Sequence, residues 1–303
     1  GARSGRLQGV EQEGEKTMGK IVIVGSGPAG CSAALYAARA GQEVVVISMG
    51  MGALSKAELI QNYYGFEEGI TGAELYRQGV AGAKAVGAEF ITAEVVGLDY
   101  TGSLVVQTTE GDYPADAVIL ATGTGRIAPK IAGLAEHEGR GVSYCATCDA
   151  FFYRGKTAAV LGSGEYALHE VQALLPLAGK VILCTNGEPL TADFPEGVEI
   201  CTEKLAAVEG EEKVSALRLE NGELLPVEGL FVALGVAGSA ALARKLGAPV
   251  ENGRIVVDEK MQTGIPGLFA AGDCTGGMLQ VCKAVYEGAL AATEAIKQIR
   301  GKK

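Results

Sequence analysis

The sequence predicts an α/β protein with two doubly wound parallel sheets, the second domain inserted into the first. Three observations predict it. A GxGxxG loop follows the apolar run 20–24, and a GxGxxA loop follows the apolar run 157–161. Each loop leads into a stretch with helical spacing and then another apolar run, which is the order of a Rossmann-like dinucleotide-binding domain. A Gly-Asp pair after the apolar run 267–271 returns the chain to the first domain.

Length and composition limit the class of protein. The 303 residues suffice for two domains, and 48% hydrophobic against 20% charged residues is typical of a globular chain. The net charge of −10 argues against a nucleic-acid partner. No window approaches the roughly 20 apolar residues of a membrane span, so we expect no membrane association and a cytoplasmic location. Residues 1–17 are polar and aperiodic, which indicates a disordered leader or an expression remnant.

The first glycine loop is predicted to hold a dinucleotide. The first glycine makes the tight turn, the second lets the backbone approach a pyrophosphate, and the third lets the helix pack on the strand. The next strand, 43–48, ends in Ser48, where an acidic residue usually binds the ribose; a hydroxyl is a weaker partner. The loop consists of Gly25, Ser26, Gly27, Pro28, Ala29 and Gly30.

The segments after this unit alternate between helix and strand. We predict a helix at 75–87 and strands at 89–98, 103–108 and 112–120, from their spacing and hairpin residues. Further strands are expected at 180–184, 198–201, 206–209, 214–219 and 229–235.

A compact redox unit lies between the two loops. Cys145 and Cys148 are three apart and can cycle between dithiol and disulfide, and Asp149 can donate and accept the proton that this exchange needs. Two other interpretations are a permanent structural disulfide and half of a zinc site. Zinc needs four soft ligands, and only five scattered cysteines, His137 and His169 remain, so we expect no metal.

The segment 141–156 around this pair resembles the active-site segment of the low-molecular-weight thioredoxin reductases, which are FAD flavoprotein disulfide reductases. The resemblance runs from about Lys20 to the C-terminus. It implies a discontinuous FAD-binding domain, 18–128 and 254–303, and an inserted domain, 129–253, like an NAD(P)H domain, that carries the cysteines. Asp273 would accept a hydrogen bond from the ribityl chain of FAD; the alternative is a helix cap. Further residues that the resemblance places around FAD are Gly52, Ala53, Leu54, Asn62, Ala121, Thr122, Gly123, Gly272, Leu279 and Gln280.

The resemblance also implies a mechanism and partners. Reduced FAD would reduce the Cys145–Cys148 disulfide, with Cys148 facing the flavin and Cys145 as its partner. The dithiol would then reduce thioredoxin or a thioredoxin-like protein through a mixed disulfide. A rotation of one domain against the other near 127–129 and 253–254 would bring the cysteines to each partner in turn. Similar enzymes are homodimers.

The second loop departs from the pattern that NADPH requires. The 2′-phosphate of NADPH needs cationic donors, and residues 181–203 include no Arg, Lys or His. NADH would need an acidic residue where Cys184 and Thr185 stand. Tyr166 would also place a ring beside the loop, unless it points into the core and Asn186 binds ribose.

These departures favour a protein donor. The chain is most similar to the ferredoxin-dependent flavin thioredoxin reductases, which lack a working NADPH site, so we predict ferredoxin as the electron donor. A conventional NAD(P)H-dependent thioredoxin reductase is the alternative, and a non-catalytic flavoprotein redox sensor is a third interpretation.

Overall fold

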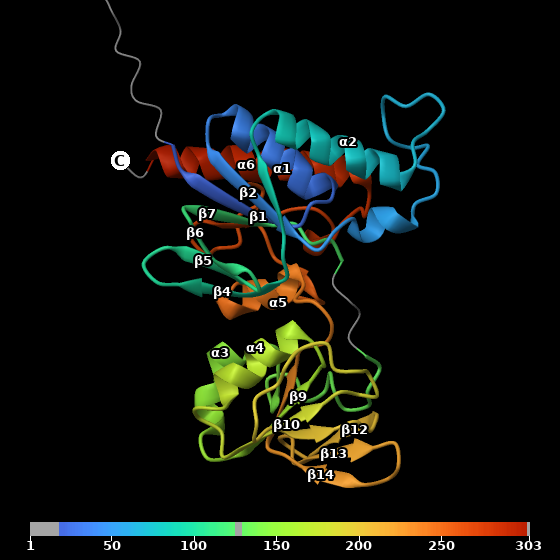
Figure 1. The fold of residues 1–303 in the computed structure, drawn as a ribbon, viewed down its shortest axis with the longest axis vertical. Helices are drawn as coiled ribbons and strands as arrows, with labels where there is room; N and C mark the ends of the chain where they lie inside the picture. Colours follow the sequence, from blue (N-terminus) through green and yellow to red (C-terminus); the bar gives the residue numbers. More distant parts are fainter. Residues whose placement is uncertain (1–17, 125–128, 302–303) are drawn as a thin grey trace, which may run out of the picture.

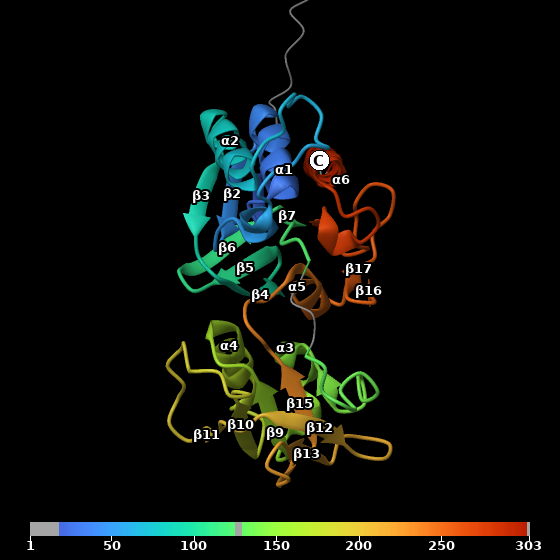
Figure 2. The same cartoon turned by 90° about the vertical axis from the view of Figure 1, so that its right-hand side faces the viewer.

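The computed structural model describes residues 18–124 and 129–301 and places two α/β units one above the other (Figures 1 and 2). The first unit contains both ends of the described chain, and the second contains its middle. Two parallel sheets of five strands confirm the predicted fold class. In the described residues, no helix is long and apolar enough to cross a membrane. The leader 1–17 and residues 127–128 lie outside the described ranges.

The parallel sheet of the first unit is buried on both faces, as expected for a strand sequence such as Ile-Val-Ile-Val. Three helices cover one face and a three-stranded antiparallel sheet lies on the other (Figures 1 and 2). The strands of the parallel sheet are, in spatial order, Leu268–Ala270 (β18), Ala117–Leu120 (β7), Lys20–Val24 (β1), Glu43–Ser48 (β2) and Glu89–Thr92 (β3). The helices are Pro28–Arg39 (α1), Gly72–Ala85 (α2) and Val281–Gly301 (α6). The antiparallel strands are Val95–Tyr100 (β4), Leu104–Thr108 (β5) and Gly111–Ala115 (β6).

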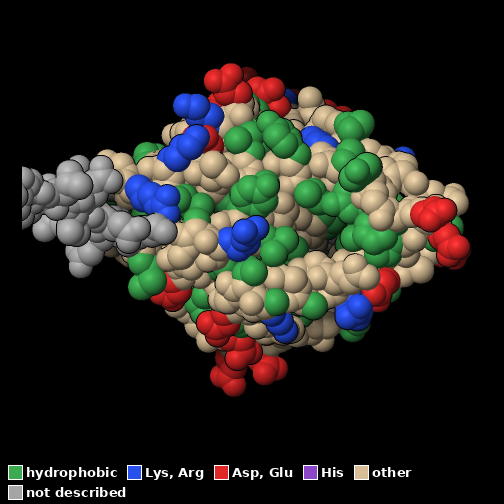
Figure 3. Space-filling view, turned by 90° about the horizontal axis from the view of Figure 1, so that it is seen from above, with side chains coloured by type: hydrophobic (Ala, Val, Ile, Leu, Met, Phe, Trp, Pro, Cys, Tyr) green, Lys and Arg blue, Asp and Glu red, His purple; other side chains and the backbone are tan. Residues whose placement is uncertain are grey.

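Small residues let α1 and α6 approach closely. A Cβ atom on Gly288 would lie 2.1 Å from the carbonyl oxygen of Ala29, so α6 contacts the α1 backbone there. The outer face of α1, α2 and α6 presents hydrophobic side chains across its middle, interspersed with Lys and Arg, and acidic side chains at its edges (Figure 3). Tyr36 of α1 and Tyr286 of α6 are 55% and 64% exposed.

Two expected strands are each divided in the structure. The predicted strand 89–98 breaks at Ala93 and Glu94, so that β3 stays in the parallel sheet while β4 joins the antiparallel one. The predicted strand 112–120 breaks in the same way at Asp116, whose carboxylate accepts a hydrogen bond from the Lys20 amide. Hydrophobic runs alone do not show where a strand changes sheet, which explains the error.

The second unit repeats the arrangement on a smaller scale. Its parallel strands, in spatial order, are Glu199–Cys201 (β11), Lys180–Cys184 (β10), Thr157–Leu161 (β9), Gly229–Val232 (β15) and Val142–Ser143 (β8). An antiparallel sheet is formed by Leu205–Glu209 (β12), Ala216–Leu219 (β13) and Leu224–Pro226 (β14). The helices are Ala146–Asp149 (α3) and Glu165–Leu174 (α4). Short 3₁₀ turns occur at Ala150–Tyr153 (η2) in the second unit and at Gly52–Lys56 (η1) and Asp273–Thr275 (η3) in the first.

A short helix, Ser239–Lys245 (α5), lies between the two units in both views (Figures 1 and 2). It packs against β4 and against the hairpin of Val250–Glu251 (β16) and Arg254–Ile255 (β17). Its last residues also reach α3 and α4 of the second unit. Because α5 contacts both units, a division of the chain near residue 253 stays a prediction.

Candidate active site

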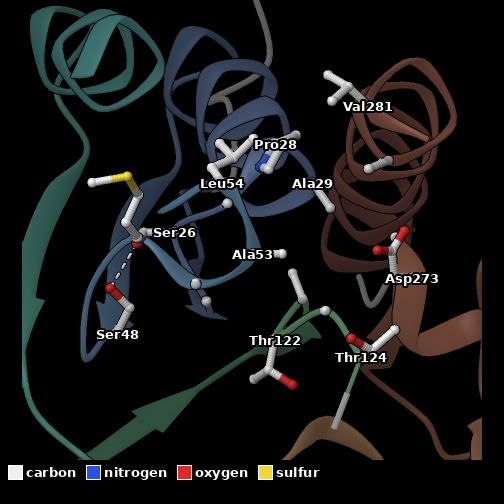
Figure 4. Close-up of a pocket in the computed structure, with 18 of the residues that line it drawn as sticks. Ser26, Pro28, Ala29, Ser48, Ala53, Leu54, Thr122, Thr124, Asp273 and Val281 are labelled. Carbon is white, nitrogen blue, oxygen red and sulfur yellow. Dashed lines mark hydrogen bonds between the residues drawn. The ribbon is translucent and has the colours of Figure 1, made fainter. Parts of the chain in front are cut away.

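A cavity of about 890 Å³ opens at the carboxyl edge of the first sheet, within the size range of small-molecule sites (Figure 4). Except for Gly30, it is lined by every residue that the sequence analysis placed around the cofactor. They are Gly25, Ser26, Gly27, Pro28, Ala29, Ser48, Gly52, Ala53, Leu54, Asn62, Ala121, Thr122, Gly123, Gly272, Asp273, Leu279 and Gln280.

The first glycine loop has the geometry that a pyrophosphate requires. Gly25 has a φ of +109°, and a Cβ on Gly30 would lie 1.9 Å from the Gly25 carbonyl oxygen, so Gly30 supports the turn from behind the cavity. A Cβ on Gly27, in contrast, would meet nothing within 4 Å. No side chain caps the start of α1, so its first amides are available to an anion.

Hydroxyl groups replace the usual acidic residue at the end of β2. The Ser48 and Ser26 hydroxyl oxygens are 2.7 Å apart (Figure 4), and Ser26 also lies 3.1 Å from the Tyr76 hydroxyl. Ser26 donates to the Gly50 carbonyl at 3.2 Å. Ser48 therefore shares its hydroxyl with a neighbour instead of presenting a free carboxylate to a ribose.

The Gly-Asp turn is held on the opposite side of the cavity (Figure 4). Gly272 has a φ of +89°, and its amide donates to the Glu287 carboxylate at 2.8 Å. Lys283 donates to the Gly272 carbonyl, and Arg254 donates to the Asp273 carbonyl. The Asp273 side chain caps no helix, because it lies inside η3 and α6 begins eight residues later. The structure therefore does not support the interpretation of Asp273 as a helix cap.

The two redox cysteines lie at the start of α3, Cys145 as its N-cap and Cys148 within it, and form a disulfide with a Cα–Cα distance of 5.3 Å. Cys145 is 4% exposed and caps α3 by accepting the Cys148 amide at 3.2 Å, whereas Cys148 is exposed. The Ser143 hydroxyl donates to Asp149 at 2.7 Å and accepts the Cys145 amide at 3.1 Å. Ser143 therefore connects the carboxylate to the cysteine backbone.

The disulfide does not line the cavity. The Cys148 sulfur lies 3.7 and 3.6 Å from the carbonyl oxygens of Arg244 and Lys245, at the end of α5. The start of α5 lies at the cavity, where the Ser239 and Thr122 hydroxyls are 2.7 Å apart. Residues 236–238, just before α5, line the cavity too, and sequence reasoning missed them because no motif marks this loop.

Comparison with known proteins identifies the family. The chain matches the pyridine nucleotide-disulphide oxidoreductases over residues 19–288. It belongs to this family. The thioredoxin reductase of Aquifex aeolicus (strain VF5) is 36% identical over 307 aligned positions, which cover 93% of this chain and 94% of that protein.

Two solved structures are similar over nearly the whole length of both chains. The atypical thioredoxin reductase TRi from Desulfovibrio vulgaris Hildenborough has a TM-score of 0.88 and 41% identity, covering 93% of this chain and 98% of that one. A ferredoxin-flavin thioredoxin reductase from Clostridium acetobutylicum has a TM-score of 0.71 and 35% identity, covering 94% and 99%. The predicted family is therefore confirmed.

FAD is the cofactor of this pyridine nucleotide-disulphide oxidoreductase, as predicted. The cavity fits it, since an open glycine and uncapped helix amides face the same space as hydroxyls and the Asp273 carboxylate. When bound, FAD supplies a centre that can take up and release electrons.

The resemblance implies that a pyridine nucleotide would bind at the second glycine loop, where the Thr191 side chain lies close to Gly164 in this structure. A Cβ on Gly164 would lie 3.0 Å from the Thr191 hydroxyl, whereas the equivalent position on Gly27 is open. The Thr191 amide also donates to the Ser163 carbonyl at 2.9 Å. The segment after β10 thus folds over the glycine that a pyrophosphate would approach.

Tyr166 does not obstruct this loop, and the prediction that its ring would stand beside it is wrong. The side chain is 3% exposed, and its hydroxyl donates to the Tyr144 carbonyl at 3.2 Å, beneath the cysteine segment. Position 166 is the second residue of α4 and faces the hydrophobic core. Burial of an aromatic ring there is favourable. The Asn186 side chain accepts the Leu205 amide at 2.8 Å, so it ties β10 to β12.

A carboxylate from the first unit approaches the start of α4. Glu94 lies between β3 and β4, and one of its carboxylate oxygens is buried without a hydrogen-bond partner. Burial and the nearby Glu165 carboxylate raise the pKa of Glu94, and the Tyr166 amide opposes the rise. Glu94 therefore lies at the Tyr166 amide, in the first turn of α4.

We expect Glu94→Gln to stabilise the protein slightly at pH 7, by roughly 0.5 kcal/mol or less, because the carboxyl is only half-buried and solvent screens its charge. Because folding raises the pKa of Glu94, its ionisation costs stability as the pH rises through the folded-state value, and glutamine avoids that cost. The gain should disappear below about pH 4, where the unfolded carboxyl is also protonated. Urea unfolding at both pH values measures this. Glu89→Gln, at an exposed position of β3, is the control, and an equal gain there would contradict the explanation.

Proposed function

We propose that the protein is a thioredoxin reductase whose FAD is reduced by a one-electron donor protein such as ferredoxin and not by NADPH. The second glycine loop carries this proposal, because Thr191 lies against Gly164 there, whereas a Cβ on the equivalent Gly27 would meet nothing within 4 Å. The approach of Glu94 to α4 adds charge repulsion against a phosphate. The similarity to a ferredoxin-flavin thioredoxin reductase supports the donor.

The pyrophosphate of FAD would lie at Gly27 and the start of α1, with Ser48 near the adenosine end and Asp273 near the ribityl chain. The amides of α1 stabilise negative charge at their end of the cavity. Glu287 and Lys283 hold the Gly272–Asp273 turn in place from behind. These contacts are what the cavity geometry supports best.

Thioredoxin is the proposed substrate. The exposed Cys148 is followed within four residues by Phe151 and Phe152, whose side chains are 66% and 67% exposed. Two exposed aromatic rings beside a disulfide suit a protein partner that must press against it. Relatives that match nearly the whole chain are thioredoxin reductases.

The cysteines reach the flavin only if the units move. In this arrangement α5 separates the disulfide from the cavity, with its start at one and its end at the other. A rotation of the second unit, as the resemblance implies, would bring Cys148 to the cavity and later return the cysteine pair to a position where thioredoxin can reach it.

Anaerobic reduction of the FAD-loaded protein tests the donor. We expect neither NADPH nor NADH to bleach the flavin absorbance within minutes, and reduced ferredoxin to bleach it and then to reduce thioredoxin. Prompt bleaching by NADPH would favour the conventional enzyme. A flavin that is reduced while the disulfide stays oxidised would favour the redox sensor.

One observation favours the NADPH-dependent alternative. Lys204 folds back onto the turn after β10, where a Cβ on Gly187 would lie 3.2 Å from the Lys204 Cε atom. Lys204 lies one residue beyond the range 181–203 that has no cation, so the sequence-based prediction did not include it. If NADPH does reduce the flavin, Lys204→Met should slow reduction by NADPH but not reduction by NADH, because only NADPH has the 2′-phosphate that would lose its cation.

We further propose a homodimer formed through the outer face of α1, α2 and α6. A hollow of about 210 Å³ on this face is lined mainly by apolar and aromatic side chains, among them Leu35, Tyr36, Tyr63 and Val285. A second copy would cover these rings. Light scattering should give twice the chain mass, and Tyr36→Glu should give a monomer.

A further inference from the structure

A fully buried ion pair joins α5 to α4 beside the disulfide. Lys245 in the last turn of α5 donates to Glu170 of α4, and each side chain is 1% exposed. None of the functions proposed above uses either residue. Burial of two charges is costly unless further bonds satisfy them, so the other bonds of this pair show what it holds.

Glu170 binds the helix that carries the cysteines. Its second carboxylate oxygen accepts the amide of Ala146 at 2.5 Å, and Ala146 directly follows Cys145. Its first oxygen lies 3.3 Å from His169 Nδ1. Burial alone would raise the pKa of Glu170, but the bonds from His169, Lys245 and the Ala146 amide together lower it. The carboxylate is therefore ionised beside the disulfide at neutral pH.

Lys245 reaches the same disulfide from the other side. Its backbone carbonyl oxygen lies 3.6 Å from the Cys148 sulfur, while its ammonium group lies 5.6 Å from the centre of the Tyr166 ring. Tyr166 in turn donates to the carbonyl of Tyr144, just before Cys145. The pair and its neighbours thus contact the cysteine segment at both ends.

We propose that Lys245 and Glu170 are positioning residues for the redox disulfide, which they hold against α5 while their opposite charges balance next to the sulfurs. The proposal rests on the proposed function only in that the disulfide is reduced and reformed. Reduction breaks the S–S bond, takes up two electrons and two protons, and leaves two thiols, one of which loses a proton to become the nucleophile. A lone cation beside that thiolate stabilises it, and a lone carboxylate destabilises it.

The balance depends on a small set of ionisable neighbours, which stay the same in the variants below. They are His169 and Tyr166 on α4, Arg244 on α5, Asp149 on α3, Tyr144 before α3 and Glu94 near the start of α4.

Three variants separate charge from packing. Glu170→Gln retains an acceptor for the Ala146 amide and leaves Lys245 as an unpaired cation. Lys245→Met retains the length of the side chain and leaves Glu170 as an unpaired carboxylate that still accepts from Ala146. The double variant is neutral and, because a buried pair can be replaced without loss of fold, serves if a single variant does not fold.

The readout is the pH dependence of thiol alkylation in the FAD-loaded protein. The protein is reduced with dithiothreitol, freed of it anaerobically and treated with iodoacetamide, and mass spectrometry follows the tryptic peptide 141–154, which holds both cysteines. This reaction needs neither ferredoxin nor thioredoxin, so an error in the proposed donor or substrate does not affect it.

We expect the midpoint of alkylation to fall by about one pH unit in Glu170→Gln, to rise by about one unit in Lys245→Met, and to stay within about 0.3 units of wild type in the double variant. In a glutathione buffer, Glu170→Gln should favour the dithiol about tenfold, which corresponds to about 30 mV. Single variants that shift in the same direction or not at all, or a double variant that shifts by a full unit, would overturn the proposal.

Discussion

Cys148→Ser is expected to abolish reduction of thioredoxin, with a loss in kcat/KM of about 10³-fold or more. One thiol alone can form a mixed disulfide but cannot resolve it, so the two-electron exchange stops half-way. FAD should remain bound, because neither cysteine lines the cavity. Steady-state thioredoxin reduction, with the flavin spectrum recorded on the same sample, measures both effects.

The serine variants also assign the two sulfurs. With a thioredoxin that retains only its attacking cysteine, activated as a mixed disulfide with thionitrobenzoate, we expect the Cys148→Ser variant to attack through Cys145, release thionitrobenzoate and form a stable mixed disulfide. Cys145 is 4% exposed in this arrangement, so a trapped adduct there would also require the units to move. Cys282→Ser is the control, since Cys282 is an exposed free thiol, and it should keep full activity. An adduct confined to the Cys145→Ser variant would reverse the assignment.

Much of the fold follows from local sequence patterns. The two glycine loops, the apolar strands around them and the Gly-Asp turn each have a short-range signature, and the structure places the first loop and the turn around one cavity. Chain order then allows few topologies, because strand–helix–strand crossovers are right-handed. For this reason the α/β class and the residues of the first loop could be proposed without coordinates, whereas the other cavity-lining residues came from the family resemblance.

Contacts between distant segments could not be predicted. Thr191 covers the second loop from a segment with no motif, and Lys204 reaches Gly187 although it lies 17 residues further along the chain. The Lys245–Glu170 pair joins positions 75 residues apart. Tyr166 lies in the first turn of α4, where a small rotation of the helix determines whether the side chain points into the core or towards the glycine loop. Such choices are made by tertiary packing, which the pattern of a single strand or helix does not contain.

Asp149→Asn is expected to slow reduction of thioredoxin by about 10²- to 10⁴-fold, the range for loss of a general acid or base. Asp149 directly follows Cys148, and its carboxylate accepts a hydrogen bond from Ser143, which also accepts the Cys145 amide. Asparagine preserves the shape and can still accept from Ser143, but it cannot take up or release a proton. The thiol that must ionise would then exchange its proton with water alone.

Single-turnover kinetics isolate this step from the electron donor. The enzyme is reduced with dithiothreitol, freed of it and mixed with oxidised thioredoxin, so that the flavin is bypassed. The slow rate in Asp149→Asn should recover as the pH rises and thiolate forms without a base, whereas a purely structural defect would be equal at all pH values. Asp112→Asn, at an exposed position of β6, should match wild type. A wild-type rate in Asp149→Asn would mean that proton transfer at this disulfide does not depend on Asp149.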